Sequence, residues 1–180
     1  MTAVMDYARI SQAISILNQG STAYFAIGKK TAWTDEDNPP AEDTTKQVLD
    51  EVIGYRKADK FSLCIPLASG ATPIYPTVTY GKNVYQLVPQ ADAYKVKATS
   101  IYFETSIASS DFPDGPFREV GLHLGLQSKV AGKLNLLPTE VASTGILWLL
   151  TNDILTPRTQ SRSVTLSYLL TVKPIVGSAE

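Results

Sequence analysis

The chain has 180 residues, of which 44% are hydrophobic and 18% are charged, and its net charge at pH 7 is -1. Such a balance lacks the excess of positive charge that holds nucleic acid or an anionic membrane, so we expect neither partner. The single cysteine, Cys64, excludes an internal disulfide and is typical of a protein that folds in a reducing cytoplasm. No apolar run approaches the roughly 20 residues that cross a bilayer, and residues 1–10 lack the apolar segment of a signal peptide.

The first predicted element is a helix over residues 8–18. Its apolar side chains recur at i, i+3, i+4 and i+7, which places them on one stripe, and Gly20 follows as a natural stop. Two interpretations stay open: the helix packs on the chain's own core, or it is an arm that packs on a neighbouring subunit. The stripe consists of Ile10, Ala13, Ile14 and Leu17.

Residues 29–40 follow a short buried strand and are predicted to form a stiff loop. Trp33 is followed by three acids at positions 35–37, and then by Pro39 and Pro40, which exclude regular structure. The tryptophan is either a lid on the domain's own core or an anchor for a partner protein. The acids could in principle hold calcium, but the spacing of an EF-hand is absent and a solvated acidic loop fits better.

A second helix is predicted over residues 44–55. Thr44 and Gln47 have the spacing of a capping box, and the apolar residues behind them repeat with helical period. That stripe consists of Val48, Leu49, Val52 and Ile53.

From residue 60 onward the pattern changes to strands. Residues 77–80 and 83–89 are expected to pair through a turn at Gly81 and Lys82, and residues 164–172 are the cleanest amphipathic strand. Residues 127–144 have no clear pattern, and residues 151–163 are predicted to be a polar loop. The remaining predicted strands are residues 24–27, 61–67, 94–107, 117–126 and 145–150.

The strand over residues 117–126 has one apolar side and one nearly bare side. Glycine in the interior of a strand weakens the strand unless a ligand or another backbone segment approaches it closely. Gly121 and Gly125 flank the only histidine, His123, so we expect another backbone or a partner protein on that side.

No pattern of residues indicates catalysis or a metal site, and no cofactor is expected. A pair formed by Cys64 and His123 is formally possible, but a buried structural thiol is the commoner case. Arg158 and Arg162 could grip an anion or lie at a subunit interface. Two weaker alternatives are a sugar platform formed by Tyr75, Tyr80 and Tyr85, and a hydrolase that uses Glu104, Asp111 or Asp114.

These patterns predict a mainly β chain of the α+β class. We expect an antiparallel β-sandwich or partial barrel with two short helices in the N-terminal third. Residues 1–20 would be an N-terminal helix or arm, and residues 21–180 a single β-rich structural domain that includes the helix over 44–55.

Part of the sequence resembles the baseplate wedge proteins of contractile-tailed bacteriophages. Residues 24–40, which read YFAIGKKTAWTDEDNPP, are similar to the opening signature of that family: a strand ending in glycine, a Trp-x-Asp-Glu-x-x-Pro-Pro loop and then a helix. The runs YRK at 55–57, NVYQL at 83–87 and FREVGL at 117–122 continue the resemblance. The chain is shorter than the larger members of that family, so the resemblance is to a short member, which we expect to be without their inserted domains.

The resemblance implies a structural subunit of a tail baseplate or related contractile injection machine, with no enzymatic site. Its partners would be other tail proteins and copies of itself, not nucleic acid, a membrane or a small-molecule substrate. It would be made in the bacterial host cytoplasm and reside in the virion. The alternative is a carbohydrate-binding, adhesin-type β domain that touches the host surface. The predicted partner interface consists of Trp33, Asp35, Glu36, Pro39, Pro40, His123, Arg158 and Arg162.

Overall fold

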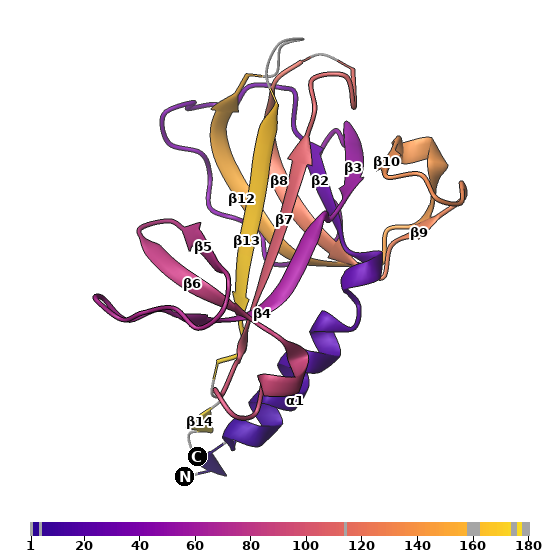
Figure 1. The fold of residues 1–180 in the computed structure, drawn as a ribbon. Helices are drawn as coiled ribbons and strands as arrows, with labels where there is room; N and C mark the ends of the chain where they lie inside the picture. The colour runs from indigo at the N-terminus through magenta and orange to yellow at the C-terminus, as the bar shows by residue number, and fades with distance from the viewer. Residues whose placement is uncertain (1, 4, 114, 158–162, 174–175, 178–180) are drawn as a thin grey trace. The chain divides into compact units, whose positions relative to one another are not determined.

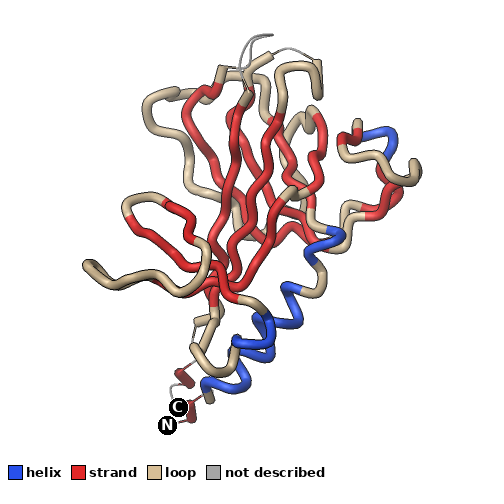
Figure 2. The backbone as a smooth tube through the Cα atoms, in the orientation of Figure 1, coloured by secondary structure: helices blue, strands red, loops and turns tan. Residues whose placement is uncertain are grey.

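A computed structural model describes residues 2–3, 5–113, 115–157, 163–173 and 176–177. The chain packs as two compact units. The first unit comprises Met1–Gly20, Lys60–Glu104 and Ser167–Glu180, and the second comprises Ser21–Asp59 and Thr105–Leu166. Figure 1 and Figure 2 show that the regular structure of the chain is mainly strand. Among the described residues, no helix is long and apolar enough to cross a membrane.

The first unit contains the single α-helix of the described residues, α1. It spans Asp6–Leu17 and buries Ile10, Ala13 and Ile16, close to the predicted stripe. The guanidinium of Arg9 donates to the carbonyl of Val172 at 3.1 and 3.2 Å. The helix therefore packs on its own unit, as the first of the two interpretations expects.

The sheet of the first unit has the strand order β13-β7-β4-β6-β5. The predicted hairpin is confirmed, and it turns at Gly81, whose φ of 59° favours glycine. The predicted strand over 94–107 begins only at residue 100, because the chain before it forms turns that include Lys97 at a φ of 55°. The strands of this sheet are β4 (Lys60–Pro66), β5 (Thr77–Tyr80), β6 (Asn83–Val88), β7 (Ser100–Ile107) and β13 (Val164–Thr171). The unit also contains a separate pair of short strands, β1 (Thr2–Ala3) and β14 (Val176–Gly177), and a 3-10 turn, η2 (Gln90–Asp92). β7 and β13 each contribute residues to both units.

The second unit is built on an antiparallel sheet with the order β10-β3-β2-β8-β12 (Figure 1). Its strands are β2 (Tyr24–Gly28), β3 (Gly54–Lys57), β8 (Phe117–Leu124), β10 (Asn135–Leu136) and β12 (Ile146–Thr156). A small pair of β9 (Gln127–Ser128) and β11 (Val141–Ser143) accompanies it, with 3-10 turns η1 (Gly20–Thr22) and η3 (Pro138–Glu140). The prediction of a mainly β chain with antiparallel sheets is confirmed. The choice between sandwich and partial barrel, and the domain boundary at residue 20, stay predictions.

β8 lies between β2 and the edge strand β12 in this sheet, and all eight of its residues are buried. The side that the sequence leaves bare is covered by the chain itself. A Cβ on Gly121 would stand 2.5 Å from a methyl of Leu49 and 2.8 Å from a methyl of Leu147. Glycine is thus required here for a close approach, as expected, but the approaching group is the chain's own aliphatic side chains.

The predicted helix over residues 44–55 is wrong, because this segment is a loop that ends in β3. Its backbone groups bond to other segments: Asp50 N–H donates to the Glu119 carboxylate at 2.7 Å, and Ile53 N–H donates to the Ile27 carbonyl at 2.8 Å. Such bonds replace the i to i+4 bonds of a helix. Two residues of the predicted apolar stripe still pack in the interior, since Leu49 and Ile53 are buried.

β12 is longer than the predicted strand and absorbs part of the predicted polar loop. It continues to Thr156, with Asn152 paired to Glu119 of β8. Its register against β8 shifts between Leu147 and Leu149, which marks a β-bulge.

Candidate interaction site

The segment of residues 29–53 between β2 and β3, called the acidic loop below, carries most of the predicted interface residues. It holds seven acidic and three basic residues, a net charge of -4 against -1 for the whole chain. Its two ends are tied together, since Lys29 N–H donates to the Asp50 carbonyl at 2.6 Å. The Glu51 carboxylate accepts the N–H groups of Lys30 and Thr31 at 2.9 Å each. The loop is therefore closed at its base by specific hydrogen bonds.

Trp33 is half-buried and fastens the loop to β12. Its indole N–H donates to the carbonyl of Asp153 at 2.9 Å. The ammonium of Lys29 lies 5.3 Å from the ring centroid, within the range of a cation–π contact. The tryptophan is thus engaged within its own unit, and its role as an anchor for a partner stays a prediction.

Glu36 fastens the same loop to β8 through Arg118. The guanidinium Nε lies 2.8 and 3.0 Å from the two carboxylate oxygens, and Arg118 is only 6% exposed. Glu36 also accepts the N–H of Trp33 at 3.0 Å, and the hydrogen bond from Arg118 lowers the pKa of its carboxyl group. A largely buried arginine needs such a partner, so this pair fixes where the loop sits on β8.

Asp35 shapes the tip of the loop, which comprises residues 35–40. Its carboxylate accepts the side-chain amide of Asn38 at 3.0 Å and the backbone N–H groups of Asp37 and Asn38 at 3.0 and 3.3 Å. These bonds, that of the Asn38 side chain first, lower the pKa of Asp35. Pro39 is half-buried and Pro40 is exposed. The tip therefore presents an ordered acidic surface to solvent.

A buried ion pair secures the second half of the loop. The Glu119 side chain is fully buried, and its carboxylate lies 2.6 Å from the Lys46 ammonium. The ammonium also lies 3.1 Å from the Asp50 carboxylate. Burial alone would lower the pKa of Lys46, but the hydrogen bonds to Glu119 and Asp50 outweigh it and raise the pKa.

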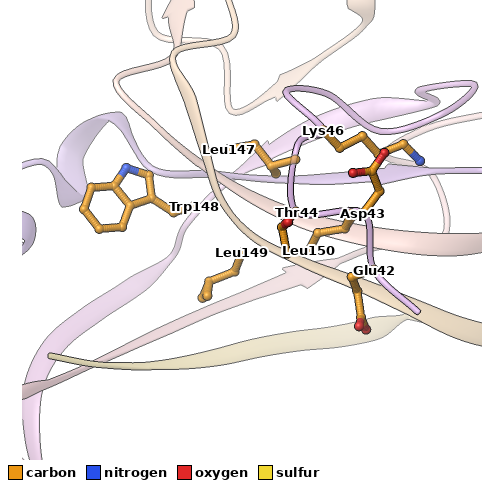
Figure 3. Close-up of a pocket in the computed structure, with 8 residues that line it drawn as sticks. All are labelled: Glu42, Asp43, Thr44, Lys46, Leu147, Trp148, Leu149 and Leu150. Carbon is orange, nitrogen blue, oxygen red and sulfur yellow. The ribbon is translucent and has the colours of Figure 1, made fainter. Parts of the chain in front are cut away.

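A groove lies between this half of the loop and β12 (Figure 3). It has a volume of about 280 Å³ and is called the acidic groove below. Leu147 and Leu150 point toward the loop in Figure 3, whereas Trp148 and Leu149 point away from it, as the bulge requires. The residues that line the groove are Glu42, Asp43, Thr44 and Lys46 from the loop and Leu147, Trp148, Leu149 and Leu150 from β12.

β12 also holds the loop directly at the end of this groove. The Asn152 side-chain amide donates to the carbonyl of Pro40 at 2.9 Å, and its backbone N–H approaches the Glu42 carboxylate at 3.4 Å. Both walls of the groove are therefore fixed relative to each other.

The structure does not bring His123 to the surface of this site. His123 is 0% exposed, with its Nδ1 3.1 Å from the Thr144 carbonyl and its ring edge-on to Tyr55. Burial lowers the pKa of its imidazole to about 4. Its burial leaves no surface at His123 for a partner contact in this fold, and Leu49 and Leu147 cover the neighbouring Gly121 on the same side of β8. Arg158 and Arg162 lie outside the described residues.

The described side chains that were candidates for catalysis are either uncharged or already engaged by a hydrogen bond or an ion pair. Burial raises the pKa of the Cys64 thiol to about 12, so it is not a nucleophile. Glu104 lies 2.7 Å from the Lys60 ammonium, and Asp111 accepts the Asn135 amide at 2.7 Å. Asp114 lies outside the described residues. Within the described part of the chain, no three His, Cys, Asp or Glu residues are grouped to hold a metal ion.

The sequence did not identify Arg118 and Glu119, the two residues of β8 that hold the acidic loop in position. The available signal was two adjacent charges at the start of an otherwise apolar strand. A charge in a buried strand needs a partner of opposite sign. Their partners, Glu36 and Lys46, lie more than 70 positions away, and nothing in the sequence identifies them.

Comparison with known proteins places the chain in a phage family. Residues 1–172 match the family described as baseplate wedge 3 tail fiber network component. The chain is also 37% identical over 174 residues to virion protein 3 of Enterococcus phage phiEF24C, covering 96% of each chain. The protein therefore belongs to the family of baseplate wedge 3 tail fiber network components and is part of the phage virion.

Proposed function

We propose that this protein is a structural subunit of the baseplate wedge of a contractile tail, and that it holds neighbouring tail proteins in place through the acidic loop. Family membership supports the baseplate role. We choose the acidic loop as the contact surface because it is exposed, has a net charge of -4 and is held in place by the buried side chains of Arg118 and Glu119.

A surface that is ordered before it meets its partner loses little conformational entropy on binding. Trp33, Glu36 and Lys46 supply that order, because each ties the loop to β8 or β12. The exposed groups of the tip, among them Asp35 and Pro40, are then free to contact a partner. The partner would carry a basic surface, since electrostatic complementarity sets specificity and association rate.

The mechanism is mechanical. The subunit keeps its neighbours in one arrangement before contraction and permits another after it, without chemistry of its own. Copies of the chain, as well as other tail proteins, are the proposed neighbours.

The carbohydrate-binding alternative gains no support from the tyrosines. Tyr75, Tyr80 and Tyr85 are half-buried. The Tyr75 hydroxyl donates to Asp92 at 3.0 Å, and the Tyr80 ring stands edge-on to Tyr102. A sugar platform requires exposed ring faces, so we do not favour this function.

Cross-linking of intact virions with an amine-reactive reagent tests the proposal. Lys30 is exposed at the base of the acidic loop, whereas Lys82 is exposed on the β5–β6 turn and serves as a comparison. We expect cross-links that join Lys30 to other baseplate proteins. A chain that is absent from purified baseplates, or whose Lys30 joins no other protein, would contradict the proposed function.

A further inference from the structure

We propose that the acidic groove is a docking site for a lysine or arginine side chain of a neighbouring baseplate protein. This inference rests on the proposed function and identifies the chemistry of the partner. The groove combines an aliphatic wall with carboxylates at its edge, and long basic side chains are built from the same two parts.

The aliphatic wall comes from β12. Leu147 and Leu150 are only partly buried, and they point toward the loop from the strand that forms one edge of the sheet (Figure 3). Beneath them they pack against the buried cluster that includes Leu49. An alkyl stem laid along this wall would cover apolar surface that the fold leaves exposed.

The carboxylates come from the loop. Glu42 and Asp43 are both exposed at the groove. Asp43 accepts the N–H and hydroxyl of Thr45 through one oxygen, at 2.9 and 2.7 Å. That arrangement orients the carboxylate, and the hydrogen bonds lower its pKa, so it is ionised at neutral pH.

Lys46 is the one cation among the described residues that line the groove, and it does not cancel this charge. The Lys46 ammonium is matched by Glu119 and Asp50, at 2.6 and 3.1 Å. Glu42 and Asp43 therefore leave the groove negative. An arginine would add the planar fork that engages carboxylates through two bonds.

The test is incorporation into phage particles that carry variant genes. The Glu42→Gln/Asp43→Asn variant removes two negative charges with little change of shape, and asparagine keeps the turn at position 43. The control is Ser69→Lys/Thr72→Lys, which changes the net charge by the same amount at exposed residues of another loop. Copies per virion are counted by quantitative mass spectrometry, and urea unfolding of the purified chains checks the fold.

We expect the groove variant to be incorporated about tenfold less than wild type, as loss of a partly desolvated ion pair implies, and the control to match wild type. A Glu42→Lys phage, selected for restored growth, should acquire an acidic residue in place of a lysine or arginine of another tail protein. Suppressors confined to this chain would indicate a second copy instead and contradict the assignment.

Normal incorporation of the groove variant would overturn this inference, as would an equal loss in the control. Absence of the wild-type chain from baseplates would instead refute the proposed function itself. The wild-type measurement therefore separates the two failures.

Discussion

Replacing Lys46 with methionine tests how the acidic loop is held. The substitution keeps the length of the stem but removes the ammonium that lies 2.6 Å from the fully buried carboxylate of Glu119. The remaining hydrogen bond to that carboxylate comes from the Asp50 N–H at 2.7 Å. Removing one partner of a buried pair costs about 3–5 kcal/mol. Because the Lys46 side chain is itself 22% exposed, we expect a loss of about 2–4 kcal/mol in the free energy of unfolding.

The assay is urea unfolding, with Lys97→Met as the matched control. Lys97 lies 3.2 Å from Asp6, but the two side chains are 71% and 45% exposed, so the same substitution should cost at most about 1 kcal/mol. Adding Glu119→Gln to Lys46→Met should recover part of the loss, because no unpaired charge then stays buried. Equal effects of Lys46→Met and Lys97→Met would refute the account of how the loop is anchored.

Three further outcomes are expected. Gly121→Ala should destabilise the chain by about 1–3 kcal/mol in urea unfolding, because its Cβ would overlap Leu49 and Leu147, and Leu49→Ala in the same chain should relieve only the overlap with Leu49. His123 titrates near pH 4 in the fold against 6.5 when unfolded, so the unfolded chain takes up its proton first and stability falls as pH drops through that window. Between pH 7 and 4.5 the wild type should lose about 2–3 kcal/mol more than His123→Gln; equal losses would contradict this. Trp33→Phe removes the bond to Asp153, so amide exchange in residues 33–38 should accelerate while that of β8 stays unchanged.

The strands could be predicted because their signals are local. The alternation around Leu122 and the turn at Gly81 each decide a strand or hairpin within a few residues. The same locality explains the error over residues 44–55. Thr44 and Gln47 offer a helix cap, but the bonds of Asp50 and Ile53 to distant strands decide the conformation.

The candidate site was predictable in part. The tryptophan, acids and prolines of residues 33–40 identify a stiff exposed loop from composition alone. The acidic groove was not foreseen, since its walls join Glu42 to Leu147, more than 100 positions apart. The burial of His123 was not predictable for the same reason, since Leu49 and Leu147, which cover the neighbouring Gly121 on this side of β8, lie far from it in the sequence.

Reconstruction of the intact baseplate by electron cryomicroscopy tests the central claim most directly. The account predicts density of another baseplate protein against residues 33–43, with a basic side chain in the acidic groove. A baseplate in which this loop faces solvent, or a particle that lacks the chain in its baseplate, would contradict it.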